Sequence, residues 1–313
     1  MYREVKKYLK QIKLNNLVII GGSGFIGKSI MDSFNRGLLK KYLINKLIII
    51  CRKKIVFKNK KKINFKNIKV IYSDIRKIKK LPKSNLYIYA SETTKIDQYK
   101  NTKKIVTKHK ESINNFCELI KEHPNVKVLY LSSGVAEKKY LNNSKIGYKK
   151  IYSFLKNFSE NKIKLLKKYK INTSIARCYT FIGPFLPTNE HFAIGNFLSD
   201  AKYKKKITIN SRNLVYRSYM YADDMVDWLL AILIFAKKNT KIYNVGSDCQ
   251  IELRQLALLI SKFCKGKTEI ISKSLNSKKV DRYVPNINKT KNDFNLKIKY
   301  NLTKSIKSTF HSI

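Results

Sequence analysis

The sequence contains few of the residues that build metal sites and disulfide frameworks. Its 313 residues include five cysteines and four histidines. The cysteines are odd in number and scattered, and no C-x-x-C motif occurs, so neither a zinc site nor a set of disulfides is predicted. No two histidines stand at ligand spacing, which argues against a histidine metal site. The cysteines, which we expect to be the reduced thiols of a cytoplasmic protein, are Cys51, Cys117, Cys178, Cys249 and Cys264.

Long apolar segments are also missing. The longest, WLLAILIFA at residues 228–236, is too short to cross a bilayer. The first residues, MYREVKKYLKQIKLNN, are basic but lack the apolar core of a signal peptide. From the sequence we therefore expect a cytoplasmic protein without a membrane partner.

Acidic residues are scarce, since 20 Asp and Glu stand against 67 Lys and Arg, a formal net charge of +47. Such a charge is typical of proteins that bind nucleic acid or other polyanions. The basic residues, however, are spread along the whole chain, as biased codon usage would produce. The densest run, residues 53–69, contains no recognised nucleic-acid motif. Solvated lysine-rich faces are therefore the preferred interpretation and no specific nucleic-acid partner is expected, with a polyanion-binding scaffold as the alternative.

Short, continuous apolar runs are abundant, and 43% of the residues are hydrophobic. Continuous runs are typical of strands covered on both faces, and their alternation with helical patterns predicts right-handed βαβ units and a parallel sheet. After residue 187 the pattern changes to helices near 189–204, 222–237 and 252–265 and short strands at 207–209, 242–246 and 268–273. We predict an α/β fold: a doubly wound parallel sheet over residues 1–183, to which a segment near 215–246 returns, and a smaller C-terminal α/β lobe over 184–313. The runs that predict the sheet are 17–20, 47–50, 68–72, 86–90, 126–131 and 173–176.

A glycine cluster follows the first of these runs. Only 11 glycines occur in the chain, and four fall within seven positions of LVIIGGSGFIGKSI. Gly21, Gly24 and Gly27 have the spacing G-x-x-G-x-x-G between a strand and a helix. Glycine permits the tight turn and lets the backbone approach a pyrophosphate at the helix N-terminus. We therefore predict a Rossmann-type dinucleotide site that also includes Phe25 and Ile26; a tight turn without ligand is the alternative.

The ends of the next strands bear on which dinucleotide binds. The second strand ends in IIICRKK, where Arg52 is present and no carboxylate is available to bond a ribose 2′-hydroxyl. Arginine accommodates a 2′-phosphate, so the prediction is NAD or NADP with a modest preference for NADP. Asp74 and Ile75, after the third strand, are predicted to contact the adenine, and Ala90, at the end of the fourth, is assigned to the same site.

Five tyrosines are followed four places later by a lysine, and spacing alone distinguishes none of them in a chain so rich in lysine. In this type of sheet the ligand lies beyond the carboxyl ends of the strands, so a functional pair must begin the helix after the fifth strand. Tyr152 and Lys156 alone do so, and the fifth strand ends with Ser132 and Ser133. The five pairs are Tyr2/Lys6, Tyr42/Lys46, Tyr99/Lys103, Tyr152/Lys156 and Tyr300/Lys304.

These residue types suit removal of a proton from an alcohol. A free tyrosine has a pKa near 10, so its use as a base near pH 7 costs roughly 4 kcal/mol. An adjacent ammonium and a cationic nicotinamide both favour the phenolate, and residues at i and i+4 share one helix face. We predict that Tyr152 is the base, that Lys156 favours its phenolate, that both contact the cofactor, and that Ser133 holds the substrate hydroxyl.

These segments resemble the extended short-chain dehydrogenase/reductase family, in particular its nucleotide-sugar epimerases and dehydratases, over nearly the whole chain. GGSGFIG resembles the cofactor loop, and LSSG with YSFLKNFSE resembles the Ser and Tyr-x-x-x-Lys core, Glu160 included. ARCYTFIGP (176–184) resembles the R-x-x-N-V-Y-G-P strand, and YRSYMYADDMVDWLL (216–230) the R-D-F-x-Y-V-x-D helix start. IYNVGSD and RYVPNINKTKNDFNLK resemble the closing motifs, and HFAIGNFL (191–198) a branch common in surface-polysaccharide gene clusters.

The resemblance implies a substrate site in the C-terminal lobe. Asn196, Arg217 and Arg282 would hold a nucleotide diphosphate, for which arginine is suited because it forms bidentate, charge-assisted bonds to phosphate. Alternatively, Asn196 caps a helix and the arginines form surface salt bridges. Thr180 stands where the family carries a substrate-touching asparagine, so it is assigned to the substrate site. The resemblance also implies a homodimer through helices near 102–121 and 151–169.

One departure from the family pattern argues against a 4,6-dehydratase reaction. Sugar 4,6-dehydratases carry an Asp-Glu pair directly after the hydroxyl residue, whereas this chain has Gly134 and Val135, with Glu137 displaced. The resemblance thus implies an NAD(P)-dependent enzyme that oxidises a sugar C4 hydroxyl, an epimerase in the first instance. An NADPH-dependent 4-ketosugar reductase is the alternative enzyme. A dinucleotide sensor without turnover and an inactive Rossmann scaffold that binds a polyanion are the alternatives of other classes.

Overall fold

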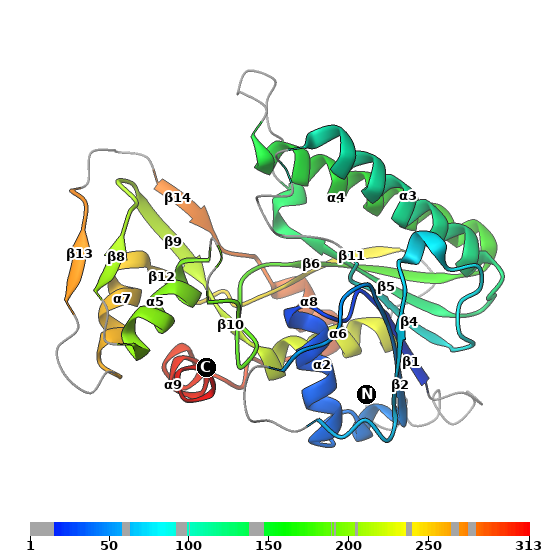
Figure 1. Cartoon of the computed structure of the whole chain (residues 1–313), viewed down its shortest axis with the longest axis horizontal. Coiled ribbons are helices and arrows are strands. Elements are labelled where there is room, and N and C mark those ends of the chain that lie inside the picture. The colour runs from blue at the N-terminus through cyan, green and yellow to red at the C-terminus, as the bar shows by residue number, and fades with distance from the viewer. Residues whose placement is uncertain are drawn as a thin grey trace. The chain divides into compact units, whose positions relative to one another are not determined.

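The computed structural model describes residues 16–57, 63–91, 99, 101–137, 147–188, 190, 192–203, 206–235, 240–263, 269–274 and 280–313 (Figure 1). The chain forms two compact units. Unit 1 comprises Met1–Cys178 and Val226–Tyr243, and unit 2 comprises Tyr179–Met225 and Asn244–Ile313. The N-terminal segment 1–15, for which no signal peptide is predicted, part of the basic run 53–69, and Cys264 lie outside the described residues.

A seven-stranded sheet forms the centre of unit 1, and its strand order is β11-β6-β5-β4-β1-β2-β3. The pairings from β6 through to β3 are parallel, and the order reverses direction at β1 and β4, as in a doubly wound sheet. The predicted fold class is therefore confirmed. The strands are β1 (Asn16–Ile20), β2 (Lys46–Cys51), β3 (Ile68–Tyr72), β4 (Leu86–Tyr89), β5 (Lys127–Ser133), β6 (Asn172–Cys178) and β11 (Lys241–Val245).

Helices cover both faces of this sheet, which explains why its strands are continuously apolar. Figure 1 shows α3 (Thr102–Lys121) and α4 (Tyr148–Leu165) side by side on one face, and α2 (Phe25–Asn35) and α6 (Ala222–Phe235) on the other. Phe116 of α3 and Ile163 of α4 are buried with Tyr89 and Tyr130 of the sheet in one hydrophobic cluster. The residues of β4 and β5 are buried throughout.

Two polar contacts fix α6 within unit 1. The Tyr42 hydroxyl donates to an Asp227 carboxylate oxygen at 2.5 Å, and burial together with this carboxylate raises the pKa of Tyr42. The Lys127 ammonium, 7% exposed, donates to the Ile234 carbonyl oxygen near the end of the helix. Burial lowers the pKa of Lys127 to about 8, because the charged form is poorly solvated there.

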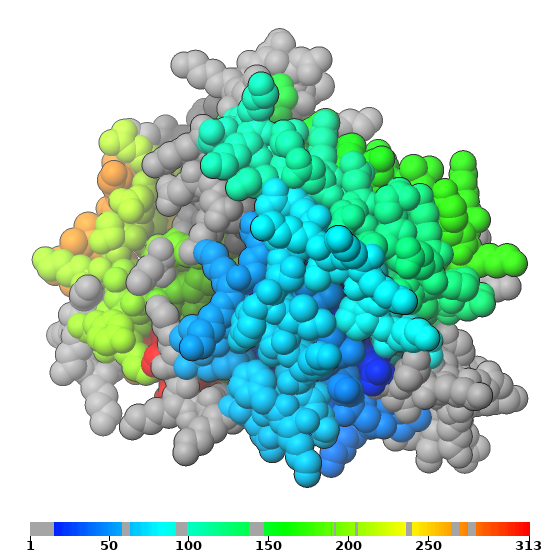
Figure 2. All heavy atoms as spheres, turned by 45° about the vertical axis from the view of Figure 1, so that its right-hand side comes forward, coloured from blue at the N-terminus to red at the C-terminus, as the bar shows by residue number. Residues whose placement is uncertain are grey.

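The sheet of unit 1 ends at the edge strand β3. Its last residue, Tyr72, is 57% exposed, and Phe65 just before the strand is 45% exposed. Figure 2 shows the chain from this edge to β4 spread over the visible face beside α3. The short helix η2 (Ile75–Lys77) begins this segment, so the residues predicted to meet an adenine lie directly after the edge strand.

Unit 2 has its own hydrophobic core. The core includes Ile194 and Phe197 of α5 (Ala193–Lys202) and Leu256 and Ile260 of α7 (Leu253–Ser261). The predicted strand at 207–209 is β8 (Ile207–Ile209), which pairs in parallel with β13 (Ile270–Ser272). A three-stranded sheet of order β12-β9-β14, with strands Gln250–Glu252, Leu214–Ser218 and Val280–Tyr283, was not predicted from the sequence pattern. The other elements are β7 (Phe181–Ile182), β10 (Met220–Tyr221), α8 (Asn288–Phe294) and α9 (Leu302–Ser312).

Candidate active site

The turn between β1 and α2 can be made only with glycine at its first position. Gly21 has φ +94°, and a Cβ atom there would lie 2.4 Å from the Ser91 Cα and 2.5 Å from the Ala90 carbonyl. The Gly21 amide donates to the Ile50 carbonyl at 2.7 Å, and the Ala90 amide donates to the Ile20 carbonyl at 2.7 Å. The glycine turn thus lies against the carboxyl ends of both neighbouring strands, and Ala90 is part of its wall.

Two further glycines in this turn have opposite surroundings. A Cβ on Gly27 would lie 2.2 Å from the Gly22 carbonyl oxygen, so this glycine lets α2 pack against the turn. A Cβ on Gly24 would meet nothing within 4 Å among the described residues. Gly24 is the N-cap of α2, and no side chain in the described part of the chain caps this helix. The space beside the N-cap position of α2 is thus open among the described residues, and an open space at a helix N-terminus suits a phosphate.

Asp74, which lies just after β3, forms an ion pair with Arg76 two residues later. Its carboxylate accepts hydrogen bonds from the Arg76 amide at 3.1 Å and from the Arg76 guanidinium at 3.1 and 2.7 Å. These bonds hold the pKa of Asp74 below its usual range. Arg52, 53% exposed, lies 3.8 Å from the same carboxylate, and Ile75 is buried beside it. A carboxylate has about four lone-pair sites, so Asp74 retains acceptor capacity for an adenine amine.

The Tyr152/Lys156 pair lies on the inner side of α4. Lys156 is 4% exposed, and its ammonium donates to the Leu131 carbonyl of β5 at 2.8 Å. The same ammonium lies 5.5 Å from the centroid of the Tyr152 ring and 5.4 Å from that of Tyr130. The lysine thus connects the helix to the strand whose last residue is Ser133.

The two serines at the end of β5 differ in their partners. Ser132, 3% exposed, donates to the Glu160 carboxylate at 2.6 Å. The Ser133 hydroxyl, 7% exposed, accepts from the Val135 amide at 3.3 Å. Successive strand residues point to opposite faces of the sheet, and the Glu160 contact places the Ser132 hydroxyl on the face covered by α4. The loop 138–146, between Ser133 and α4, lies outside the described residues.

A second tyrosine accompanies Tyr152 and was not predicted. Tyr99, 7% exposed, meets the Tyr152 ring edge to face with centroids 6.2 Å apart. Tyr99 begins one of the other four Tyr-x-x-x-Lys pairs, and no local pattern in the sequence distinguishes it. Its contact with Tyr152 restricts the orientation of that ring.

The two arginines predicted to bind substrate lie on neighbouring strands of unit 2. Arg282 pairs in register with Tyr216, and Arg217 with Tyr283, so the two arginines lie on opposite faces of the β9-β14 pair. Arg217 donates to the Asp281 carboxylate at 2.8 Å and to its carbonyl at 2.9 Å. Arg282 donates to the Gln250 side chain at 2.6 Å, with its guanidinium 4.9 Å from the Tyr216 ring. The assignment of both arginines to one nucleotide diphosphate stays a prediction, since the register fixes only the faces of the two strands.

The two other residues predicted to contact substrate lie on different elements. Asn196 is the fourth residue of α5, whose N-cap is Phe192, so the alternative that Asn196 caps the helix is wrong. The Thr180 carbonyl accepts from the Met220 amide at 3.0 Å, just before β7. Both side chains are half-buried.

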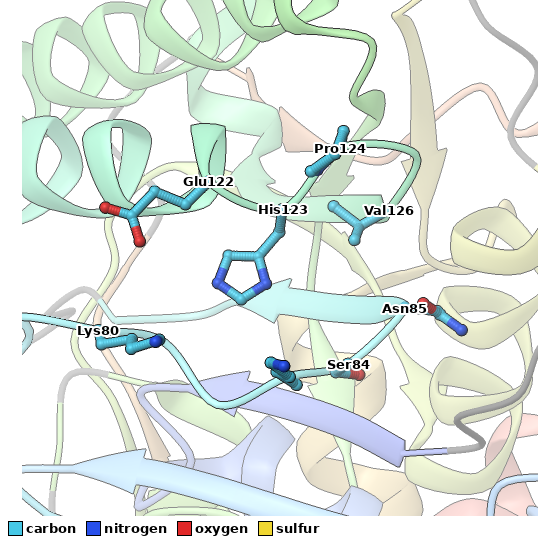
Figure 3. A pocket seen from close by; sticks show the side chains of 8 residues that line it. Lys80, Ser84, Asn85, Glu122, His123, Pro124 and Val126 are labelled. Carbon is cyan, nitrogen blue, oxygen red and sulfur yellow. The ribbon is translucent and has the colours of Figure 1, made fainter.

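A separate pocket of about 360 Å³ lies at the other end of the sheet, beside the amino ends of β4 and β5 (Figure 3). His123 is one of the side chains that line it (Figure 3), and its pKa is lowered by burial and by Lys80 and Lys83, against the opposing effect of Glu122. The buried Nε2 of His123 has no hydrogen-bond partner among the described residues. This pocket is remote from the glycine turn, which lies at the carboxyl ends of the strands.

Two other kinds of site are absent from the described residues. No group of three or more His, Cys, Asp or Glu side chains there is arranged to hold a metal ion. None of the helices in the described ranges is long and apolar enough to span a membrane.

Comparison with known proteins agrees with this architecture. Residues 17–246 match the model of the "NAD dependent epimerase/dehydratase family". The chain belongs to this family. The family's description names NAD as the cofactor on which its members depend. The family assignment also confirms the resemblance found from the sequence motifs.

Individual family members are only distantly similar. UDP-glucuronic acid decarboxylase 3 of Arabidopsis thaliana is 24% identical over 104 residues, which are 33% of this chain and 30% of the relative, so the match spans about a third of either protein. UDP-N-acetylglucosamine 4-epimerase of Methanobrevibacter ruminantium M1, in complex with UDP-N-acetylmuramic acid, has a TM-score of 0.79 at 16% identity, covering 96% of this chain and 98% of that one. UDP-glucose 4-epimerase of Thermotoga maritima, with UDP-glucose, has a TM-score of 0.75 at 18% identity, covering 95% and 98%. At these identities the structural likeness establishes the fold.

Proposed function

We propose that this family member is a nucleotide-sugar 4-epimerase in which Tyr152 removes the proton of the sugar C4 hydroxyl. The observation that carries the proposal is the buried Lys156 ammonium, 5.5 Å from the Tyr152 ring centroid and hydrogen-bonded to β5. A cation held in a poorly solvated site favours a neighbouring phenolate more strongly than a cation in water does. Ser133, at the end of the same strand, would orient the hydroxyl toward Tyr152.

The cofactor site of this proposal is the turn from β1 to α2. Gly24 leaves room for a pyrophosphate, the first-turn amides of α2 would bind it, and Gly21 and Ala90 would form the wall behind it. A nicotinamide dinucleotide bound there supplies reversible hydride transfer at C4, which epimerisation requires. Lys156 would also bond the nicotinamide ribose, and Asp74 with Ile75 would contact the adenine.

The substrate would be held by unit 2, which we propose as the substrate-binding lobe. Arg217 or Arg282 would bind the diphosphate by charge-assisted bonds, with Asn196 and Thr180 as further contacts. The similar epimerases of known structure were solved with UDP-sugars, so UDP-sugars are the first substrates to try.

The test is turnover of UDP-, dTDP-, CDP- and GDP-sugars with NAD and NADP, followed by mass spectrometry and NMR. Tyr152→Phe should lower kcat by about 10²–10⁴-fold, because general-base catalysis contributes on that order. Tyr300→Phe is the matched control, since Lys304 follows at the same spacing with its ammonium 4.9 Å from the Tyr300 ring. Its activity should match the wild type. Undiminished turnover by Tyr152→Phe, or no turnover of any sugar by the wild type, contradicts the proposal.

A 4-ketosugar reductase is the second candidate, and one observation favours it. Arg52 is 53% exposed and its ion pair with Asp74 is long, at 3.8 Å, so it is available for the 2′-phosphate of NADPH. The two reactions differ in stoichiometry: a reductase oxidises one NADPH per sugar, whereas an epimerase consumes no net cofactor. Tight, saturable, salt-sensitive binding of a polyanion without dinucleotide affinity would exclude both enzymes.

We also propose that the protein is a homodimer that works in the cytoplasm. The outer surface of α4 and the following turn exposes large apolar side chains, with Phe154 51%, Leu165 50% and Tyr169 45% exposed. Burial of such side chains is the usual driving force for association. Sedimentation analysis of the wild type and of Phe154→Lys tests the dimer, since the variant should dissociate if α4 lies in the interface. The reduced cysteines found among the described residues suit a cytoplasmic protein.

A further inference from the structure

The inner face of α4 is unusual in being polar as well as buried. Ser153, Lys156, Ser159 and Glu160 are between 0% and 5% exposed. Buried polar groups are stable only when hydrogen-bonded. Ser153 donates to the Val135 carbonyl at 3.1 Å, and Ser159 bonds the His109 ring of α3 at 2.7 Å. The helix is therefore positioned by directional contacts and not by apolar packing alone.

The strongest of these contacts is at Glu160, which is 1% exposed. Its carboxylate accepts two parallel bonds of 2.9 Å from the Arg177 guanidinium and one of 2.6 Å from the Ser132 hydroxyl. Ser132 and Arg177 are partners in the register of β5 and β6. Glu160 thus binds two neighbouring residues at once, Ser132 on β5 and Arg177 on β6. A bidentate bond fixes orientation as well as distance.

Glu160 and Lys156, on the same face of α4, both form hydrogen bonds to β5. Lys156 bonds the carbonyl of Leu131, and Glu160, one helical turn later, bonds the side chain of Ser132. Two contacts one turn apart on the helix, to successive residues of one strand, prevent α4 from sliding along β5 or rotating against it. A slide of one helical residue, about 1.5 Å, would remove the lysine from its carbonyl.

We infer that Glu160, Arg177 and Ser132 are positioning residues that hold α4 in register against β5, so that Lys156 keeps its bond to the Leu131 carbonyl and the Tyr152/Lys156 pair keeps its place along that strand. This rests on the proposed function for its catalytic consequence, but the position of Lys156 can be measured without turnover. The three residues act through Lys156 and touch no reacting atom. Their loss should therefore reduce kcat and leave KM for the sugar unchanged.

The experiment compares Glu160→Gln with Ser159→Ala, which removes a buried hydrogen bond at the adjacent position of the same helix, directed to α3. Exposure of Lys156 is measured as its rate of modification by an amine-reactive reagent, mapped by mass spectrometry. The rate should rise at least tenfold in Glu160→Gln and match the wild type in Ser159→Ala. Where the wild type turns over a sugar, kcat should fall 10- to 100-fold in Glu160→Gln alone. Ser132→Ala, which keeps the ion pair, should show smaller changes in the same direction and replaces Glu160→Gln if that variant does not fold.

An unchanged modification rate in both Glu160→Gln and Ser132→Ala overturns the inference. An equal rise in Ser159→Ala also overturns it, because any loosening of α4 would then suffice. If the modification rate of Lys156 rises in Glu160→Gln but kcat is unchanged, the catalytic consequence of positioning Lys156 is overturned. If the wild type turns over no sugar, the proposed function fails, while the modification rates still decide whether these residues position Lys156.

Discussion

Replacing Gly24 by alanine is expected to weaken dinucleotide binding while leaving the fold intact. Gly24 has φ −85° and ψ −173°, which alanine adopts freely, and the added Cβ meets no described atom within 4 Å. Alanine restricts the unfolded chain, a gain of about 0.4–1 kcal/mol, but is a poorer N-cap than glycine by an amount of similar size. The free energy of unfolding should therefore change by less than about 1 kcal/mol.

The affinity for the cofactor should change much more. The new methyl group occupies the space assigned to the pyrophosphate, and a loss of 10- to 100-fold corresponds to about 1.4–2.8 kcal/mol. Gly27→Ala is the contrasting variant, because its Cβ would lie 2.2 Å from the Gly22 carbonyl oxygen and 2.4 Å from the Gly22 Cα. Such overpacking against backbone costs about 1–3 kcal/mol or more, so its melting temperature should fall by several degrees.

The two properties are measured separately. Thermal unfolding followed by circular dichroism gives stability, and titration of NADH or NADPH fluorescence gives affinity. Wild-type affinity in Gly24→Ala would show that the pyrophosphate binds elsewhere. An unaltered melting temperature in Gly27→Ala would refute the argument from close packing.

Three further perturbations test other parts of the structure. Because the pKa of Lys127 is lowered from 10.5 to about 8, the folded chain binds fewer protons than the unfolded chain between these values, and stability rises with pH over that window. Urea unfolding should show that wild type gains about 2 kcal/mol relative to Lys127→Met between about pH 7.5 and about pH 10; parallel curves contradict the burial argument. Arg52→Ala should lower the affinity for NADPH at least tenfold and leave that for NADH within about twofold, and equal losses would remove Arg52 from 2′-phosphate recognition. Since Arg217 and Arg282 lie on opposite faces of their strands, only one of the two alanine variants should raise KM for the nucleotide sugar tenfold or more, and equal effects would count against the strand register.

The parts of the molecule that the sequence predicted are those determined by local pattern. Continuous apolar runs predicted six strands of the unit 1 sheet to within about two residues, because a strand covered on both faces has no polar alternation. The glycine spacing predicted the turn before α2, where Gly21 and Gly27 are required by backbone contacts. The choice of Tyr152 among five similar pairs came from its position after the fifth strand, and it stays a prediction about function.

The parts that were missed depend on register between distant segments. Strands β9 and β14 are 62 residues apart from Ser218 to Val280, and neither shows an apolar run that predicts its partner. The opposite orientation of Arg217 and Arg282 follows only from that pairing. Likewise, no sequence pattern predicts that Glu160 contacts Arg177. The contact depends on the register of β5 and β6, which places Arg177 beside Ser132.

Arginine is used in the ion pairs of this protein more often than its abundance in the sequence would suggest. The chain has nine arginines among its 67 basic residues, so lysine is the default cation of this sequence. Six of the nine nevertheless bind a carboxylate within the described residues, and Arg177 does so with two parallel bonds that a lysine ammonium cannot reproduce. In a sequence saturated with lysine, an arginine therefore marks a position where a planar, forked donor is needed, and Arg177 is such a position. The six are Arg36, Arg52, Arg76, Arg177, Arg217 and Arg254.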